Sequence, residues 1–261
     1  MGKPNRYYEK YEKAKSLYSQ GVSLTKISKE LKMDRGTLSK NLKSEGIKIV
    51  NRQNLSRVNE NIFEIIDTEE KAYWLGFFYA DGYVGDDNTI EVSLKSSDLN
   101  HLIKLKEFLN WSGEVYCNEV RCRLSFRSKK MKEDLIKLGC VPRKSLILTF
   151  PTYDIVPLHL MKHFIRGYVD GDGSIGIRKN GKAFRFSILG TQEFLLGLLE
   201  HTKWKPLKIQ KPSNIYTIEW SADYVKEYLD YLYKNSKIYL DRKYNVYLSF
   251  DESRLEEKSS L

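Results

Sequence analysis

Apolar residues recur at helical spacing in three short segments at the start of the chain. The first segment, residues 7–19, stops at Gly21, while Ser23 and Asp34 stand where a short polar side chain can cap the second and third. Two short helices joined by a turn of three to four residues are typical of a helix-turn-helix. We therefore predict a small all-α domain over residues 1–50.

Residues 51–66 lack this periodicity and are polar, basic and rich in asparagine. This composition is typical of a linker. Such a segment could follow the backbone of a nucleic acid or act as a solvated tether, and the sequence leaves both open.

From residue 67 onward, helical and alternating patterns follow one another in an order that occurs twice. Residues 67–156 and 157–261 each show an apolar helix, a hairpin, a second helix, a second hairpin and a third helix. Matching positions are 91 to 94 residues apart. We therefore expect an α+β fold in which one αββαββα unit is duplicated.

The first helix of each copy ends in an acid followed by glycine. Small residues line one face (Gly76 and Ala80, then Gly167 and Gly171), so another backbone can approach closely there. Gly82 and Gly173 then stand where a helix often takes a left-handed C′ residue. A carboxylate at a helix C-terminus opposes the helix dipole, at about 0.3–1 kcal/mol, so two such acids indicate a bound cation. Mg²⁺ suits one or two carboxylates together with phosphate oxygens and waters.

The two helix ends read WLGFFYADG (residues 74–82) and IRGYVDGDG (residues 165–173), and this pair resembles the LAGLIDADG homing endonucleases of the monomeric, two-motif type. That motif has an acid at its eighth position and glycine at its ninth. Trp74–Leu75 and Ile165–Arg166 depart from the small or aliphatic first two positions, and Tyr79 replaces an acid at the sixth. The sixth position is not a metal ligand in the family, and Asp170 is interpreted as a local hydrogen-bonding residue rather than a ligand.

The resemblance implies a fold, an activity and a set of site residues. The fold would hold two antiparallel saddle-shaped sheets with the motif helices at their centre. The activity would be metal-dependent, site-specific double-strand cleavage of DNA leaving short 3′ overhangs, as in intron homing. Asp81 and Asp172 would hold Mg²⁺ or Mn²⁺, assisted by the carbonyls of Ala80 and Gly171. Lys144 and Lys237 hold matching places in the two copies and are nominated as catalytic basic residues.

Charge supports a nucleic-acid partner. The net charge is +10, and residues 1–60 hold 14 Lys and Arg against 6 Asp and Glu. Exposed positions in the third N-terminal helix, the linker and the strands are the candidates for contact with double-stranded DNA. They are Arg35, Thr37, Ser39, Lys40, Arg52, Arg57, Lys95, Arg121, Arg123, Arg127, Arg178, Lys182 and Arg185.

The remaining composition narrows the setting. No apolar run approaches the ~20 residues of a membrane span, and the N-terminus does not begin a secretory signal. Three cysteines without a zinc-like pair predict reduced thiols. We expect a monomeric cytoplasmic protein, encoded by a bacterium or a phage and associated with the nucleoid.

Several alternatives stay open. The two acids could be solvated helix caps, the basic strand positions an ordinary solvated face, and the N-terminal helices a protein-interaction unit. His159 and His163 lie four residues apart but lack a third ligand at suitable spacing, which favours surface or core histidines. A non-cleaving transcription regulator and an RNA-binding splicing helper are the other functions compatible with a basic saddle, and an intein is disfavoured because the ends lack its nucleophile and its His–Asn pair.

Overall fold

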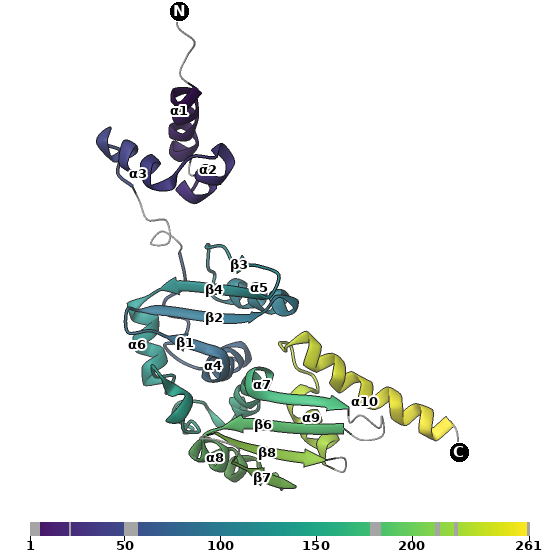
Figure 1. Cartoon of the computed structure of the whole chain (residues 1–261). Coiled ribbons are helices and arrows are strands. Elements are labelled where there is room, and N and C mark those ends of the chain that lie inside the picture. Colours follow the sequence, from purple (N-terminus) through teal and green to yellow (C-terminus); the bar gives the residue numbers. More distant parts are fainter. Residues whose placement is uncertain are drawn as a thin grey trace, which may run out of the picture. The chain divides into compact units, whose positions relative to one another are not determined.

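The structure is a computed structural model of the whole chain (Figure 1). It describes residues 6–20, 22–49, 57–177, 184–211, 215–221 and 224–259. The chain divides into two compact units, residues 1–56 and 57–261, and each is described by itself. In the described part, no helix is long and apolar enough to cross a membrane.

The first unit contains three helices, α1 (Arg6–Ser19), α2 (Leu24–Leu31) and α3 (Arg35–Ser44). Both predicted caps are present. The Ser23 hydroxyl accepts a hydrogen bond from the backbone N–H of Lys26, and the Asp34 carboxylate accepts one from that of Thr37. The three helices bury a small apolar core that includes Ala14, Ile27, Leu38 and Leu42.

The second unit begins earlier than the sequence suggested. Phe63 and Ile66 are buried in its core, and the main chain of Arg57 and Asn59 hydrogen-bonds to Ser112 and Leu109. The prediction of a linker over residues 51–66 is therefore wrong for residues 57–66, while 51–56 lie outside the described residues. Buried Phe63 and Ile66, partly buried Val58 and Ile62, and these main-chain hydrogen bonds hold the segment on the core, which a polar overall composition does not reveal.

Two four-stranded antiparallel sheets form the frame of the second unit. The first contains β1 (Gly82–Val84), β2 (Thr89–Lys95), β3 (Tyr116–Cys117) and β4 (Arg121–Arg127) in the order β1-β2-β4-β3. The second contains β5 (Gly173–Ile177), β6 (Phe184–Gly190), β7 (Lys208–Gln210) and β8 (Tyr216–Ser221) in the order β5-β6-β8-β7. The predicted α+β duplication is thus confirmed.

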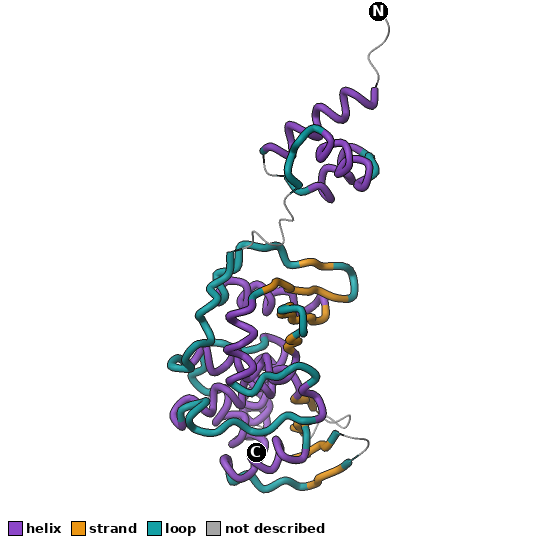
Figure 2. The backbone as a smooth tube through the Cα atoms, turned by 90° about the vertical axis from the view of Figure 1, so that its left-hand side faces the viewer, coloured by secondary structure: helices purple, strands orange, loops and turns teal. Residues whose placement is uncertain are grey.

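Helices cover one side of these sheets and leave the other side open (Figure 2). They are α4 (Glu69–Asp81), α5 (Leu99–Phe108) and α6 (Lys129–Lys137) in the first repeat, and α7 (Met161–Asp172), α8 (Gln192–Thr202), α9 (Val225–Tyr233) and α10 (Asp241–Ser259) in the second. Short 3₁₀ turns connect some of them, η2 (Ser96–Asp98), η3 (Lys144–Leu146) and η4 (Leu158–Leu160). One continuous hydrophobic core runs through both repeats.

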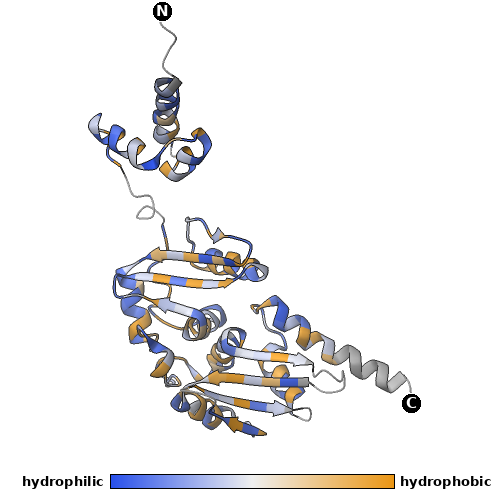
Figure 3. Cartoon of the chain, viewed as in Figure 1, coloured by the Kyte–Doolittle hydropathy of each residue, from blue (hydrophilic) through white to orange (hydrophobic). Residues whose placement is uncertain are grey.

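Alternation along the strands explains why one sheet face is covered and the other is not. In β4, Cys122, Leu124 and Phe126 are buried, whereas Arg121, Arg123 and Arg127 are exposed. The same switching between hydrophobic and hydrophilic positions is visible along the strands of Figure 3. Successive side chains of a strand point to opposite faces, so the apolar face packs on the helices and the basic face stays open.

The cysteine prediction is corrected. Cys117 and Cys122 are joined by a disulfide, and Cys140 is a buried free thiol. The two bonded residues are directly paired across β3 and β4, with Cα atoms 4.1 Å apart. An odd cysteine count does not report such proximity, because proximity comes from the hairpin register.

Candidate active site

The site is built where the two motif helices, α4 and α7, run side by side. A Cβ added at Gly76 would overlap the main-chain carbonyl of Phe164, and one at Gly167 would overlap that of Tyr73. Only glycine permits this approach of two backbones. The predicted close packing along the small-residue face is therefore confirmed, and it brings the two helix ends together.

Asp81 and Asp172 are the last residues of α4 and α7. A Cβ placed on Gly171 would lie 3.2 Å from Oδ2 of Asp81, so this carboxyl group abuts the last turn of α7. Solvent reaches both side chains, since Asp81 is exposed and Asp172 is half-buried. Two acids 91 residues apart in sequence thus share one site.

The glycines that follow these acids are not left-handed. Gly82 has φ −74° and Gly173 has φ −86°, both with extended backbone. A side chain is excluded for another reason. A Cβ at Gly82 would be 2.6 Å from the carbonyl oxygen of Phe78, and one at Gly173 would be 2.5 Å from that of Val169. The predicted C′ conformation is wrong because the chain turns directly from helix into strand.

The close approach of the two carboxyl groups changes their pKa values. Burial, and then the negative charge of Asp81, raise the pKa of Asp172 to about 6, although Lys144 and Lys243 oppose this rise. Burial also raises the pKa of Asp81, which the same two lysines lower. Although water reaches Asp81, protein atoms surround its carboxyl on most sides, so both acids ionise less readily than in free solution.

Two lysines close the helix ends. The Lys144 ammonium donates to the carbonyl of Gly82 and lies 3.4 Å from that of Ala80. The Lys243 ammonium donates to the carbonyls of Val169 and Asp170, each at 2.7 Å, and to those of Gly171 (3.2 Å) and Gly173. Cations are favourable at helix C-termini, where carbonyl groups lack partners within the helix. The carbonyls of Ala80 and Gly171, predicted to assist a metal, both face these ammonium groups.

The structural counterpart of Lys144 is Lys243, not Lys237. Lys237 is exposed, and its main-chain N–H donates to Glu69 at 3.0 Å. A constant offset between the repeats produced the wrong match. Gly82 and Gly173 are 91 residues apart, but their sheet partners Val92 and Ile188 are 96 apart, and Lys144 and Lys243 are 99 apart. The offset varies from strand to strand, since it returns to 94 for Leu124 and Ile218, so it could not by itself identify Lys243.

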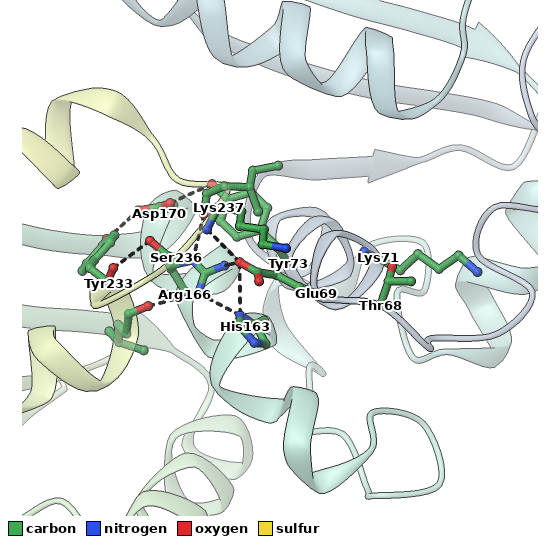
Figure 4. A network of polar contacts seen from close by, with 12 residues as sticks. Thr68, Glu69, Lys71, Tyr73, His163, Arg166, Asp170, Tyr233, Ser236 and Lys237 are labelled. Atoms are coloured by element: carbon green, nitrogen blue, oxygen red, sulfur yellow. Dashed lines mark hydrogen bonds and ion pairs between the residues drawn. The ribbon is translucent and has the colours of Figure 1, made fainter.

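A buried polar network, missed at the sequence level, supports the second helix (Figure 4). Arg166 on α7 is fully buried. Its guanidinium donates to the carbonyls of Leu232 (3.0 Å) and Ile238 (2.8 Å) and to the carboxylate of Glu69 (2.8 Å), and it contacts Nδ1 of His163 at 2.9 Å. This network ties the start of α4 to α7 and to the segment that precedes α10.

Asp170 forms the second part of that network. It is fully buried and accepts hydrogen bonds from the hydroxyls of Tyr73 (2.7 Å) and Tyr233 (2.6 Å) and from the main-chain N–H of Leu240 (2.8 Å). Asp170 is a hydrogen-bonding residue as predicted, but the prediction that its bonds are local is wrong, because its partners lie 63 to 97 residues away and are brought in by tertiary packing. Because Leu240 directly precedes α10, Asp170 helps to fix the helix that carries Lys243.

The histidines do not form a metal site. His163 is held by Arg166, and burial followed by the charge of Arg166 lowers its pKa to about 4, while His159 is exposed. Across the described ranges, no group of three or more His, Cys, Asp or Glu side chains is arranged to hold a metal ion. The oxygen atoms of Asp81 and Asp172 are therefore the candidate donors, with waters and a phosphate left to complete the coordination.

The residues expected to contact DNA are mostly exposed. Lys95, Arg121, Arg123 and Arg127 project from the open face of the first sheet, and Arg185 from that of the second. Arg35 and Lys40 are exposed on α3, Ser39 is half-buried, and the Thr37 hydroxyl is engaged by Asp34 at 2.9 Å. Arg57 is exposed within the second unit. Arg52, Arg178 and Lys182 lie outside the described residues.

Comparison by sequence gives no identification, since no family model matches the chain and no curated protein matches it. Solved structures do match. Meganuclease I-SmaMI bound to uncleaveable DNA with a TTCT central four is 12% identical, with a TM-score of 0.50 over 72% of this chain and 91% of that chain. The same meganuclease with a TTGT central four is 11% identical, with a TM-score of 0.50 over 75% of this chain and 91% of that chain. The chain therefore has the fold of the LAGLIDADG meganucleases.

Proposed function

We propose that this protein is a site-specific DNA endonuclease that makes double-strand breaks with short 3′ overhangs. The observation that carries the proposal is the meeting of two equivalent helix ends, each with a terminal acid (Asp81 or Asp172) and a lysine on its last carbonyls (Lys144 or Lys243), where both lysines lower the pKa of both acids. Two equivalent acid–lysine pairs in one site suit a reaction performed once on each strand of a duplex.

The donor set fits a divalent cation. Asp81 and Asp172 offer carboxylate oxygens, the hard ligands that Mg²⁺ and Mn²⁺ prefer. Burial, and then repulsion from Asp81, raise the pKa of Asp172, and a cation between the two groups would relieve that repulsion. When bound, such an ion polarises a phosphate oxygen and lowers the pKa of a water molecule.

The side chains around the acids have separate tasks. Lys144 and Lys243 place two positive charges beside the site, where a phosphodiester and its transition state concentrate negative charge. Both ammonium groups are buried, and their hydrogen bonds to helix-end carbonyls hold them in place. The open basic sheet faces would bind the duplex on either side.

The first unit would supply additional recognition. Its α2 and α3 have the order and turn of a helix-turn-helix, in which the N-terminal part of the second helix contacts base edges. Arg35, Ser39 and Lys40 on α3 are the candidates, because Thr37 is engaged by its cap. We propose that the chain acts as a monomer, since two motif helices are already present in it.

The test is cleavage of DNA from the protein's own locus with Mg²⁺ or Mn²⁺. The wild-type protein should produce double-strand breaks, whereas Asp81→Asn and Asp172→Asn should lose double-strand cutting by roughly 10³-fold or more while still binding DNA in Ca²⁺. Asp86→Asn is a matched control, because Asp86 is an exposed acid of the first repeat outside the site. Wild-type cutting by both Asn variants would rule out the acid assignment.

Two other outcomes would redirect the proposal. A protein that shifts DNA in a binding assay but never cuts it would be a transcription regulator on the same fold. A protein that prefers structured RNA over duplex DNA would be a splicing helper.

Removal of residues 1–56 should weaken binding and broaden site choice yet preserve cutting, since the second unit contains both acid–lysine pairs.

A further inference from the structure

The open faces of the two sheets can be compared position by position, because their registers are equivalent. Gly82 pairs with Val92 in the first sheet, and Gly173 pairs with Ile188 in the second. Ser93 follows Val92 and Leu189 follows Ile188, so these residues lie level with Asp81 and Asp172 and point outward. With the residues paired to them on the neighbouring strands, they form the inner row of each sheet. These rows would face the base pairs nearest the cut.

In the first sheet, the inner row contains an arginine whose orientation is restricted. The row consists of Ser93, Arg123 and Tyr116, which are paired across β2, β4 and β3. The Arg123 guanidinium lies 5.8 Å from the Tyr116 ring centroid and 3.9 Å from the Glu91 carboxylate. A ring and a carboxylate on two sides limit the orientations of this planar group.

The next row of the first sheet is an unbalanced pair of cations. Lys95 and Arg121 are directly opposite each other, and both are exposed. Neither forms an ion pair with a carboxylate in the described part of the chain. Like charges at directly opposed positions destabilise a sheet, so this pair is suited to an anion such as a DNA phosphate.

Arg127, at the far end of the same strand, differs from Arg123. Its guanidinium is bound by the carboxylate of Asp87 at 2.5 Å. It is therefore less available to a base edge, although it has the same side chain on the same strand and face.

The equivalent row of the second sheet carries no charge. It consists of Leu189, Thr217 and Gln210, and Leu189 is 44% exposed. The adjacent row of this face holds Ser187, Glu219 and the exposed Lys208, and Arg185, one row further from Leu189, is engaged by Glu219 at 3.3 Å. An exposed leucine in a groove-facing row suits the methyl group of thymine, which is an apolar feature of the major groove.

We propose that the two halves of the target site are read by different chemistry. Arg123 recognises guanine in the half bound by the first repeat, Leu189 recognises thymine in the half bound by the second, and Lys95 with Arg121 grips a phosphate. This inference rests on the proposed function, because it assumes that the open sheet faces bind DNA. An arginine fork matches the O6 and N7 acceptors of guanine, whereas a point charge on a phosphate carries no sequence information.

The test is selection of bound duplexes from a random pool by the full-length chain, with Ca²⁺ in place of Mg²⁺. The wild-type protein should enrich guanine at one position on one side of the centre and thymine on the other. Arg123→Ala should reduce the guanine preference by roughly 5- to 150-fold. Arg123→Lys should lose the preference while keeping most of the affinity, which separates the bidentate fork from charge and from misfolding. Leu189→Ala should weaken only the thymine preference.

The control is Arg127→Ala, which should keep the guanine preference. Lys95→Ala should weaken binding to all sequences alike and lower the salt slope by about 1. A guanine preference that survives in Arg123→Ala, or that Arg127→Ala loses equally, would overturn the assignment while leaving the proposed function intact. Failure of the wild-type protein to enrich any duplex would overturn both.

Discussion

The two motif helices end alike but differ in their middles. Each ends in an acid beside a lysine that caps its last carbonyls. The positions that hold Arg166 and Asp170 in α7 are taken by Leu75 and Tyr79 in α4, 91 residues earlier. At these two positions, and within the described residues, the first helix therefore makes a single side-chain hydrogen bond, from Tyr79, whereas the second is tied to several distant elements by the buried hydrogen bonds of Arg166 and Asp170. The ends are alike because the proposed chemistry needs an acid and a lysine at each. The middles differ because two different sets of contacts can hold the helix ends in place.

This difference between the helix middles follows from which element carries each lysine. Lys144 belongs to a short 3₁₀ turn, and Tyr79 donates a hydrogen bond to Leu138 nearby. Lys243 belongs to the first turn of α10, whose start is held by Asp170 through Leu240 and by Asp98 through Arg242 (2.9 Å). The second repeat thus uses polar anchors because its lysine comes from a separate helix.

The largest effect is expected from Arg166→Leu, which gives α7 the residue that α4 has. The free energy of unfolding should fall by about 3–5 kcal/mol, because Glu69 and two main-chain carbonyls lose their donor in a buried place. Urea denaturation measures this loss. Glu69→Gln should cost less, and the double variant Arg166→Leu/Glu69→Leu less than the sum of its parts. A neutral Arg166→Leu would remove the distinction between the helices.

A smaller effect is expected from Asp170→Leu, at about 3 kcal/mol, since it leaves two tyrosine hydroxyls and one N–H without an acceptor. The matched change in the first repeat, Tyr79→Phe, removes one hydrogen bond and should cost about 1 kcal/mol. Thermal melting of the two variants side by side gives the comparison. Equal losses would mean that the first helix is as dependent on polar anchoring as the second.

Substitution of the packing glycines tests what the helices share. Gly76→Ala and Gly167→Ala should each lower stability by about 1–3 kcal/mol, because the added Cβ would overlap the facing backbone. Gly176→Ala is the control, with no atom within 4 Å of its added Cβ. A loss of stability in only one of the two variants would show that the two glycines do not contribute equally to the packing of α4 on α7.

The last effect depends on pH and concerns His101, which joins the network from the first repeat. Its Nε2 lies 3.1 Å from the Tyr73 hydroxyl, and since that hydroxyl donates to Asp170, the imidazole is the donor in this contact. Burial, and then the charge of Lys104, lower the pKa of His101 to about 3; Arg242 and Lys243 act in the same direction, and Asp241 opposes them.

In the unfolded chain His101 would titrate near 6.5, so the unfolded state binds a proton that the folded state refuses between about pH 6.5 and 3. Stability due to this group is therefore lost as pH falls, by about 2 kcal/mol from pH 7 to pH 5. His101→Gln should have a flatter stability profile over this range, and His159→Gln, at an exposed position, should follow the wild type. Identical slopes for all three would mean that His101 takes up its proton over the same pH range in the folded and unfolded states.

The sequence by itself determined the duplication, the helix-to-strand order and the placement of Asp81 and Asp172 at helix ends. These features depend on local periodicity, on small residues four apart and on a repeated motif. The alternation of β4 also predicted which arginines would be exposed. Caps at Ser23 and Asp34 were predictable because their hydrogen bonds reach only three residues along the chain.

Only the tertiary structure decided which lysine faces the second acid, how Arg166 and Asp170 are satisfied, and where the second unit begins. Lys243 reaches the end of α7 across about 70 residues, and the partners of Arg166 other than His163 lie 66 to 97 residues away. Such contacts depend on insertions in loops and on packing against distant elements, and neither leaves a periodic trace in the sequence. Local patterns fix which face a side chain takes, whereas its partner is fixed by which elements the core brings together.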